Sequence, residues 1–148
     1  LNRLRYLFKR ICIASDHAGF QLKESIKNSL INRNISIIDL GPMNTNSVDY
    51  PDYAKRVSNR VKSKKSDIGI LVCGSGIGMS ISANKTKGIR AAVCYNSKST
   101  RLSRQHNDAN IIAIGSRLTK KRTALQLVTI FLKTKFEGGR HLRRVKKI

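Results

Sequence analysis

Residues 67–78, DIGILVCGSGIG, decide how this chain folds. Asp67–Cys73 is a continuous apolar run, which is typical of a strand covered on both faces of a parallel sheet. The glycines at 74, 76 and 78 predict a tight turn that leads into a helix over 76–85. A buried strand that passes directly into a helix indicates a βαβ unit.

Similar units lie on both sides of this stretch. Four more apolar runs predict strands at Arg10–Ser15, Ile35–Leu40, Ile89–Tyr95 and Asn110–Ile114. Helical periodicity between and after them predicts helices over Gly19–Asn32, from Pro51 to Val61, over Ser97–His106 and over Leu118–Phe136. The alternation predicts one three-layer, Rossmann-like α/β domain. We expect a five-stranded parallel sheet in the order 2-1-3-4-5, with right-handed crossovers.

Composition narrows the class of protein. The chain has 148 residues, enough for one domain, and 40% of them are apolar. No apolar run approaches the roughly 18–20 residues of a membrane span, so no membrane partner is expected. The three cysteines, at positions 12, 73 and 94, fit neither a disulfide framework nor a CxxC metal pair. Reduced thiols of this kind predict a cytoplasmic protein.

The formal net charge of +22 raises the question of a nucleic-acid partner. The basic residues are spread along the whole chain, and there are only four Phe, four Tyr and no Trp. We therefore interpret the charge as solvated surface and expect no specific nucleic acid, although polyanions would be attracted non-specifically. Residues 1–10 have no hydrophobic signal core and read as a basic N-terminal extension. Residues 11–148 form the predicted domain.

Ligands of such sheets bind beyond the carboxyl ends of the strands. Asp16 and His17 follow the first strand, and the Gly74–Gly78 turn follows the third. This turn is not a dinucleotide fingerprint, because Met79 occupies the third glycine position, and it lacks the GK[ST] of a P-loop. Its bare N–H groups favour a phosphate or a developing oxyanion, although tight strand-to-helix packing would also explain the glycines.

Several side chains near these ends could move protons or hold a phosphate. Cys73, at the junction of strand and helix, could act as a thiolate nucleophile or base, or could simply be a small buried residue. Cys12 and Cys94 lie within apolar strands, which favours a core position for both. His17 and His106 could each transfer a proton or be purely structural. Arg140 and Arg144 are four residues apart, so on a helix they would share a face that could clamp a phosphate.

Together these features resemble a known family. ASDHAGFQLK (14–23), DYPDYA (49–54), ILVCGSGIGMSISANK (70–85), GIRAAVC (88–94), LSRQHNDANIIAIGSR (102–117) and FEGGRHLRRV (136–145) occur in this order. The chain resembles the type B ribose-5-phosphate isomerases, a family shared with galactose-6-phosphate isomerase subunits. The resemblance runs from about Ile11 to the C-terminus.

The resemblance implies a Rossmann-like homodimer or homotetramer that interconverts ribose 5-phosphate and ribulose 5-phosphate, a pentose phosphate pathway reaction, without metal or cofactor. It implies that Cys73 is the base in an enediolate mechanism, that His106 helps to open the sugar ring, and that Ser75, where Thr is common, shuttles protons between oxygens. Tyr50 would have a smaller role. It also implies that substrate is bound by Asp16, His17, Gly74, Ser75, Gly76, Ile77, Gly78, Asn107, Arg117, Arg140 and Arg144.

The family builds its sites at the subunit interface, so the resemblance implies that His106, Asn107 and Arg117 complete the partner's pocket. Two alternatives remain open from the sequence. One is the same chemistry on a six-carbon sugar phosphate, such as allose or galactose 6-phosphate. The other is a polyanion- or RNA-binding protein on an isomerase scaffold, whose affinity would fall steeply with salt.

Overall fold

A computed structural model of the chain describes residues 5–148, so the first four residues of the basic extension lie outside the described residues. All strand pairings in this part of the chain are parallel, and they join five strands into one sheet. The elements, in chain order, are β1 (Ile11–Ser15), α1 (Phe20–Ile31), β2 (Ile37–Asp39), α2 (Tyr50–Lys62), β3 (Ile68–Cys73), α3 (Ile77–Ala83), β4 (Ala91–Val93), α4 (Ser97–Gln105), β5 (Ile111–Gly115), α5 (Lys121–Lys133) and α6 (Arg140–Val145).

The predicted class and the five parallel strands are confirmed, but the order of the last two strands was wrong. The sheet runs β2-β1-β3-β5-β4, so β5 pairs with β3 and β4 lies at the edge. Burial explains the difference. Every residue of β5 is buried, as a central strand requires, whereas the three residues of β4 are only half-buried. The apolar runs at 89–95 and 110–114 look alike in sequence, so periodicity alone could not rank them.

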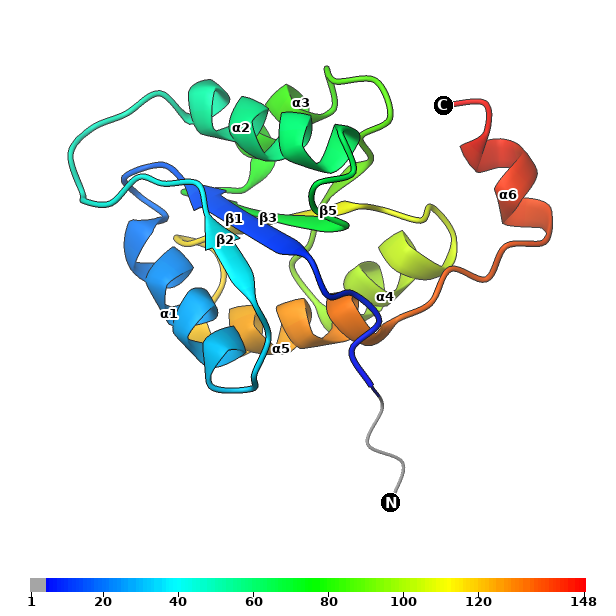
Figure 1. Ribbon diagram of the computed structural model, residues 1–148, viewed down its shortest axis with the longest axis horizontal. Helices are drawn as coiled ribbons and strands as arrows, with labels where there is room; N and C mark the ends of the chain where they lie inside the picture. The colour runs from blue at the N-terminus through cyan, green and yellow to red at the C-terminus, as the bar shows by residue number, and fades with distance from the viewer. Residues whose placement is uncertain (1–4) are drawn as a thin grey trace.

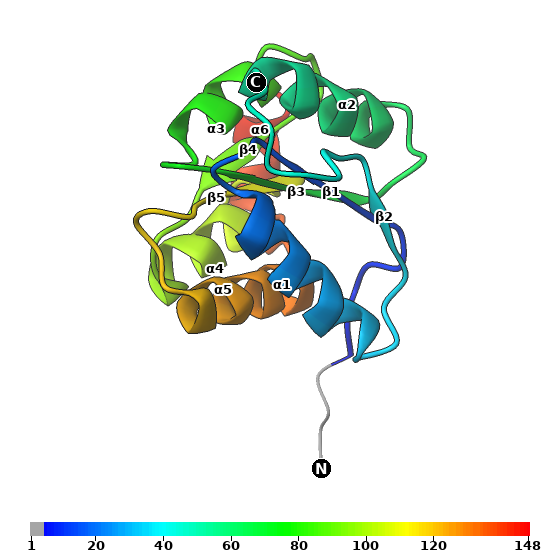
Figure 2. The same ribbon diagram turned by 90° about the vertical axis from the view of Figure 1, so that its left-hand side faces the viewer.

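Helices cover both faces of the sheet (Figures 1 and 2). The helices α2 and α3 lie on one face, and α1, α4 and α5 lie on the other. Each layer has its own apolar core because neighbouring strand residues point to opposite faces. Ile13 and Ile112 pack with Phe131 beneath the sheet, and Leu71 and Ala113 pack with α2 and α3 above it. None of the helices within residues 5–148 has the length and apolar character that crossing a membrane would require.

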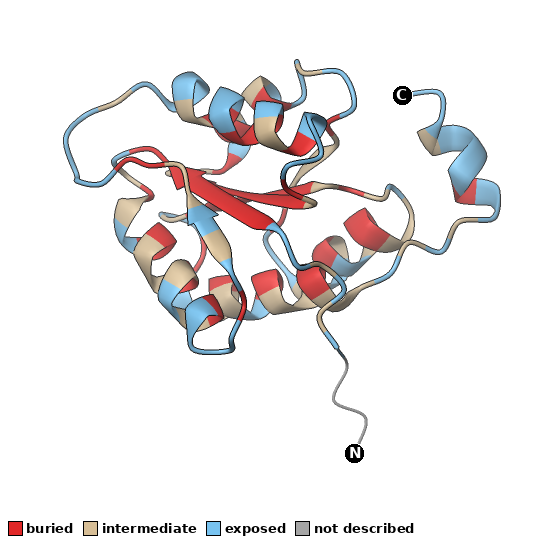
Figure 3. Ribbon diagram, viewed as in Figure 1, coloured by how far each residue is buried: buried red, intermediate tan, exposed pale blue. Residues whose placement is uncertain are grey.

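One helix, α6, stands away from these layers. It lies beside the amino ends of the strands, beyond the last turn of α4 (Figure 1). Most of its surface is exposed (Figure 3), and His141 is its one buried residue. Gly138 and Gly139, both with positive φ, form the bend that leads into it. The chain thus projects a basic helix from the edge opposite to the Gly74–Gly78 turn.

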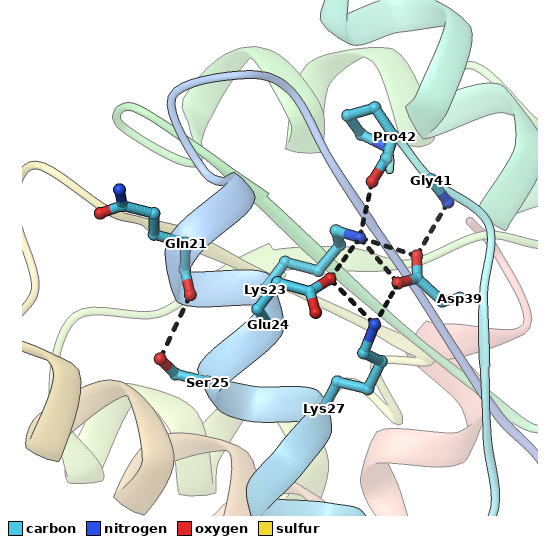
Figure 4. A network of polar contacts seen from close by, with 8 residues as sticks. All are labelled: Gln21, Lys23, Glu24, Ser25, Lys27, Asp39, Gly41 and Pro42. Atoms are coloured by element: carbon cyan, nitrogen blue, oxygen red, sulfur yellow. Dashed lines mark hydrogen bonds and ion pairs between the residues drawn. The ribbon is translucent and has the colours of Figure 1, made fainter. Parts of the chain in front are cut away.

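A buried lysine fixes the loop between β2 and α2 (Figure 4). The Lys23 side chain is fully buried, and its Nζ donates to both carboxylate oxygens of Asp39, at 2.9 and 2.7 Å, and to the carbonyl of Pro42 at 2.8 Å. Lys27 joins the same carboxylate, and Glu24 bridges the two ammonium groups. Asp39 also accepts from the Gly41 N–H at 2.9 Å. The network ties α1 to the start of this loop.

Candidate active site

The turn after β3 is built around the sulfur of Cys73. Cys73 is 4% exposed, and its Sγ accepts a hydrogen bond from the Gly76 N–H at 3.1 Å. Gly76 has a φ of +79°, and a Cβ there would approach the backbone of Ile114 to 3.0 Å. Only glycine suits both demands. The predicted tight turn between β3 and α3 is confirmed, but its Gly76 N–H is directed at Cys73, a contact that the sequence did not indicate.

Ser75 and Arg117 complete the turn. The Ser75 Oγ accepts from the Ile77 N–H at 3.2 Å, and the Ser75 carbonyl accepts from the hydroxyl of Tyr95. The Arg117 N–H donates to the Gly74 carbonyl at 3.0 Å, and its guanidinium packs so closely that a Cβ on Gly74 would lie 3.1 Å from Nη1. Arg117 therefore lies with Cys73 of its own chain, contrary to the expectation that it joins His106 in the partner's pocket.

Asp16 and His17 lie at the same carboxyl edge, after β1. Asp16 is buried and its Oδ1 accepts from the Gly19 N–H at 2.9 Å, which fixes the start of α1. The exposed His17 accepts from the Val48 N–H at its Nδ1, at 3.2 Å. In the neutral ring the proton therefore lies on Nε2, so His17 can donate a hydrogen bond outward.

Tyr50, at the start of α2, covers the other end of the turn. A Cβ on Gly78 would come within 2.8 Å of the Tyr50 ring, so this glycine is needed for the contact. A cavity of about 340 Å³ is lined by Arg117, Ala18 and Ser116 among others, but not by Cys73. The carboxyl edge of one chain thus gathers Cys73, Ser75 and Arg117, with Cys73 itself buried.

The other predicted site residues lie at the opposite edge. His106 ends α4, and the Asn107 carbonyl accepts from Nε of Arg90, the residue just before β4. Arg140 and Arg144 are exposed on α6, which confirms that both lie on one helix. His106 lies before the start of β5, and Gly115 is its last residue. The five-residue length of β5 therefore separates the amino edge of the sheet from its carboxyl edge by roughly 16 Å. A single chain does not bring His106, Asn107, Arg140 or Arg144 to Cys73.

Sequence reasoning missed two residues beside His106. The rings of His106 and His141 stack, with their centroids 4.2 Å apart, and Glu137 lies near both. Burial, with smaller contributions from the charges of His106 and Arg140, lowers the pKa of His141 below its usual value. The segment EGGRH at 137–141 contains both residues, but only its arginine was predicted to have a role.

The other two cysteines are confirmed as core residues. Cys12 and Cys94 are completely buried, and all three cysteines are free thiols. Burial raises the pKa of Cys12 to about 11 and also raises that of Cys94. Both thiols therefore stay protonated at neutral pH, so neither is a candidate base.

Comparisons with known proteins identify the relatives of this chain. Residues 11–148 match the family described as Ribose/Galactose Isomerase. The chain is 46% identical to ribose-5-phosphate isomerase B of Escherichia coli over 140 residues, covering 95% of this chain and 94% of that protein. A Thermotoga maritima ribose 5-phosphate isomerase structure superimposes with a TM-score of 0.91 at 51% identity, covering 93% of this chain and 94% of the other. A Mycoplasma genitalium ribose-5-phosphate isomerase B structure with bound ribulose-5-phosphate gives 0.88 at 43%, covering 93% and 91%.

Proposed function

The chain belongs to the ribose/galactose isomerase family, and from this premise we propose that it interconverts ribose 5-phosphate and ribulose 5-phosphate. The observation that carries the proposal is the Cys73 sulfur held at the Gly74–Gly78 turn. It is supported by 43% identity to a relative whose structure contains bound ribulose-5-phosphate. Residues 11–148 are proposed as the isomerase domain, with residues 1–10 as an extension. The three free thiols favour the cytoplasm as its compartment.

The proposed chemistry is a proton transfer between adjacent carbons. The Cys73 thiolate removes the proton from C2 of the open-chain aldose, and the electron pair left behind forms the enediolate. The thiol then returns the proton to C1, while Ser75 carries the hydroxyl proton between O1 and O2. Within residues 5–148 the Gly78 N–H has no protein acceptor, so it is free to stabilise the enediolate oxygen. These steps balance without an external oxidant.

The remaining groups would come from a second copy. His106 would assist ring opening, and Asn107 would contact the opened sugar. The phosphate would be held by Arg140 and Arg144 of α6, whereas Arg117, Asp16 and His17 would act from the chain that supplies Cys73. This arrangement follows from the roughly 16 Å that separate the two edges within one chain. We therefore propose a homodimer, or a tetramer made of such dimers, with each site shared between subunits.

Cysteine variants test the base. Purified protein is assayed for the formation of ribulose 5-phosphate from ribose 5-phosphate, beside Cys73→Ala and the matched control Cys94→Ala. We expect Cys73→Ala to lose at least about 100-fold in kcat with an unchanged fold. Cys94→Ala, which removes a buried thiol of the core, should lose stability but retain turnover. Equal turnover in wild type and Cys73→Ala would remove Cys73 from this role.

Mixed dimers test the shared site. Cys73→Ala and His106→Ala homodimers are each expected to be inactive, because every site lacks one group. Unfolding and refolding an equal mixture should restore about a quarter of the wild-type activity, because half of the dimers are hybrids with one intact site of two. If both groups acted in one subunit, no hybrid would contain an intact site and the mixture would stay inactive.

The substrate is settled by parallel assays. Allose 6-phosphate and galactose 6-phosphate are offered beside ribose 5-phosphate at equal concentration. We expect the highest kcat/KM on the pentose phosphate. A preference for a six-carbon sugar would assign the chain to the other branch of its family. Tight, salt-sensitive RNA binding with no turnover on any sugar would instead favour the polyanion-binding alternative.

A further inference from the structure

Two histidines and a glutamate form a compact cluster at the amino edge of the sheet. The Nε2 of His141 lies 3.6 Å from Oε2 of Glu137, and the Nε2 of His106 lies 3.9 Å from the same oxygen. One potential ligand atom from each residue falls within 4.8 Å of the other two. His106 lies at the end of α4, whereas Glu137 and His141 lie four residues apart, just before and within α6.

This donor set is chemically suited to a transition metal. Two imidazole nitrogens and one carboxylate oxygen are ligands that Zn²⁺ accepts readily, and three protein ligands leave a fourth position for water or another donor. Hard cations such as Mg²⁺ prefer sites made of oxygen alone. The cluster therefore favours Zn²⁺ and its first-row neighbours over the alkaline-earth ions.

The geometry is near what coordination requires. Zinc–ligand bonds of about 2.0–2.2 Å in a tetrahedron place ligand atoms roughly 3.4 Å apart. The separations of 3.6 and 3.9 Å from Glu137 must each shorten slightly, and the two histidine ligand atoms, which lie within 4.8 Å of each other, must also approach. The stacked imidazole rings, inclined by only 13°, must also tilt to direct both nitrogens at one ion. Side chains of His106 and Glu137 are 37% and 51% exposed, which leaves them room to move and leaves the site open to solvent.

We propose that His106, Glu137 and His141 bind a Zn²⁺ ion, and that this ion inhibits the isomerase. The inhibitory part rests on the proposed function, because a metal on His106 occupies the lone pair that would accept a proton during ring opening. Arg140 flanks His141 directly, and its positive charge opposes a dication. We therefore expect binding weaker than that of a four-ligand structural zinc site.

The test separates binding from activity. Full-length wild type is titrated with Co²⁺, whose visible absorption reports nitrogen and oxygen coordination, and then with Zn²⁺ to displace it. The same titrations are made on Glu137→Gln and on Asp52→Asn, a control that removes an exposed carboxylate from α2. We expect one ion per chain in wild type and Asp52→Asn. We expect about 10- to 100-fold weaker binding in Glu137→Gln, which keeps its metal-free activity.

Activity is the second readout. Zn²⁺ should inhibit wild type and Asp52→Asn at the concentrations that displace Co²⁺, and inhibition of Glu137→Gln should need about 10- to 100-fold more. Equal Co²⁺ affinity in wild type and Glu137→Gln would overturn the site, as would a thiolate charge-transfer band that vanishes in Cys73→Ala. If the protein has no isomerase activity but Co²⁺ binding still depends on Glu137, the metal site stands and the proposed function fails.

Discussion

At the scale of single residues, glycines at the turn after β3 and at the end of β5 are as important as the side chains around them. A Cβ on Gly115 would lie 2.6 Å from the backbone of Ser75, whereas a Cβ on Gly74 would meet only the flexible end of Arg117, at 3.1 Å. Backbone cannot yield as a long side chain can. The two glycines look equivalent in sequence but have different roles. Gly115 allows β5 to lie against the backbone of the turn, and Gly74 leaves room for the Arg117 side chain.

Substituting the two glycines should separate fold from binding. Gly115→Ala forces β5 away from the turn, so we expect a loss of about 2 kcal/mol or more in the free energy of unfolding. Gly74→Ala should lose less than about 1 kcal/mol, since only the Arg117 side chain must move. By displacing Arg117 it should raise KM for ribose 5-phosphate several-fold. Urea unfolding and steady-state kinetics measure both effects. Equal stability losses would contradict the distinction.

The sequence predicted the residues of the carboxyl edge well for a local reason. Cys73 is the last residue of β3, whereas Asp16 and Arg117 follow the ends of β1 and β5. Parallel strands place these carboxyl ends together. The position of His106 could not be predicted from the end of a strand, because it depends on where α4 ends relative to the sheet. Glu137 and His141 depend further on how α6 folds back, and no local pattern encodes that.

At the scale of elements, the contact between α1 and β2 depends on a buried ion network. Periodicity placed Leu22, Ile26 and Leu30 on the buried face of α1, and all three are buried. It did not predict that Lys23 is buried too, since lysine in an amphipathic helix usually faces solvent. The reason is Asp39, which meets Lys23 only after β2 has paired with β1. Such a partner, sixteen residues away, has no signature in local sequence.

Removing the Lys23 ammonium should be costly. Lys23→Met leaves the Asp39 carboxylate, 11% exposed, with one of its two ammonium partners missing, so we expect a loss of about 3 kcal/mol. The matched variant Lys27→Met removes a partner that is 20% exposed and should lose less than about 1.5 kcal/mol. Chemical denaturation gives both values. A larger loss in Lys27→Met would show that burial is not what makes Lys23 important.

The same network predicts how stability depends on pH. Burial alone would raise the pKa of Asp39, but the hydrogen bonds from Lys23 and Lys27 outweigh it and hold the pKa below its ordinary value of 3.8. A carboxyl with a lowered folded pKa stabilises the protein above its ordinary pKa, and that contribution is lost as pH falls through the folded value. The free energy of unfolding should therefore fall below about pH 4. Lys23→Met should show a flatter profile on this acid side, and an identical slope would count against the network.

At the scale of the whole molecule, the large positive net charge is the dominant electrostatic feature. Thirty basic residues face eight acidic ones, which gives a net charge of +22 on 148 residues. Like charges distributed over a small surface repel one another, and folding brings them closer together. Electrostatics at this scale should oppose the compact state, whatever local ion pairs contribute.

Added salt should therefore stabilise the protein. Raising NaCl from about 10 mM to about 200 mM shortens the screening length from roughly 30 Å to under 10 Å, which weakens the repulsion. We expect Tm to rise by several degrees. Sodium perchlorate at matched ionic strength separates screening from binding of a particular anion. A Tm that falls with NaCl would mean that ion pairs, rather than repulsion, dominate.

The projecting helix α6 supplies a second prediction at this scale. Because His141 is its one buried residue, a chain ending at Gly138 should keep the sheet and both cores. We expect Tm within a few degrees of the full chain but loss of isomerase activity, since Arg140 and Arg144 are removed. Circular dichroism and the ribose 5-phosphate assay check this. Full activity without α6 would contradict its proposed role in holding phosphate.

The separation of Cys73 and His106 onto opposite ends of the strands has an evolutionary consequence. If two subunits must meet to make one working centre, then a duplicated gene can divide the labour between its products. One descendant could lose Cys73 and the other His106, and under the proposed shared site the pair would still keep one competent pocket. Each descendant alone would be inert, so selection would preserve both. A fold with this arrangement can therefore evolve into an obligate heterodimer of two diverged chains.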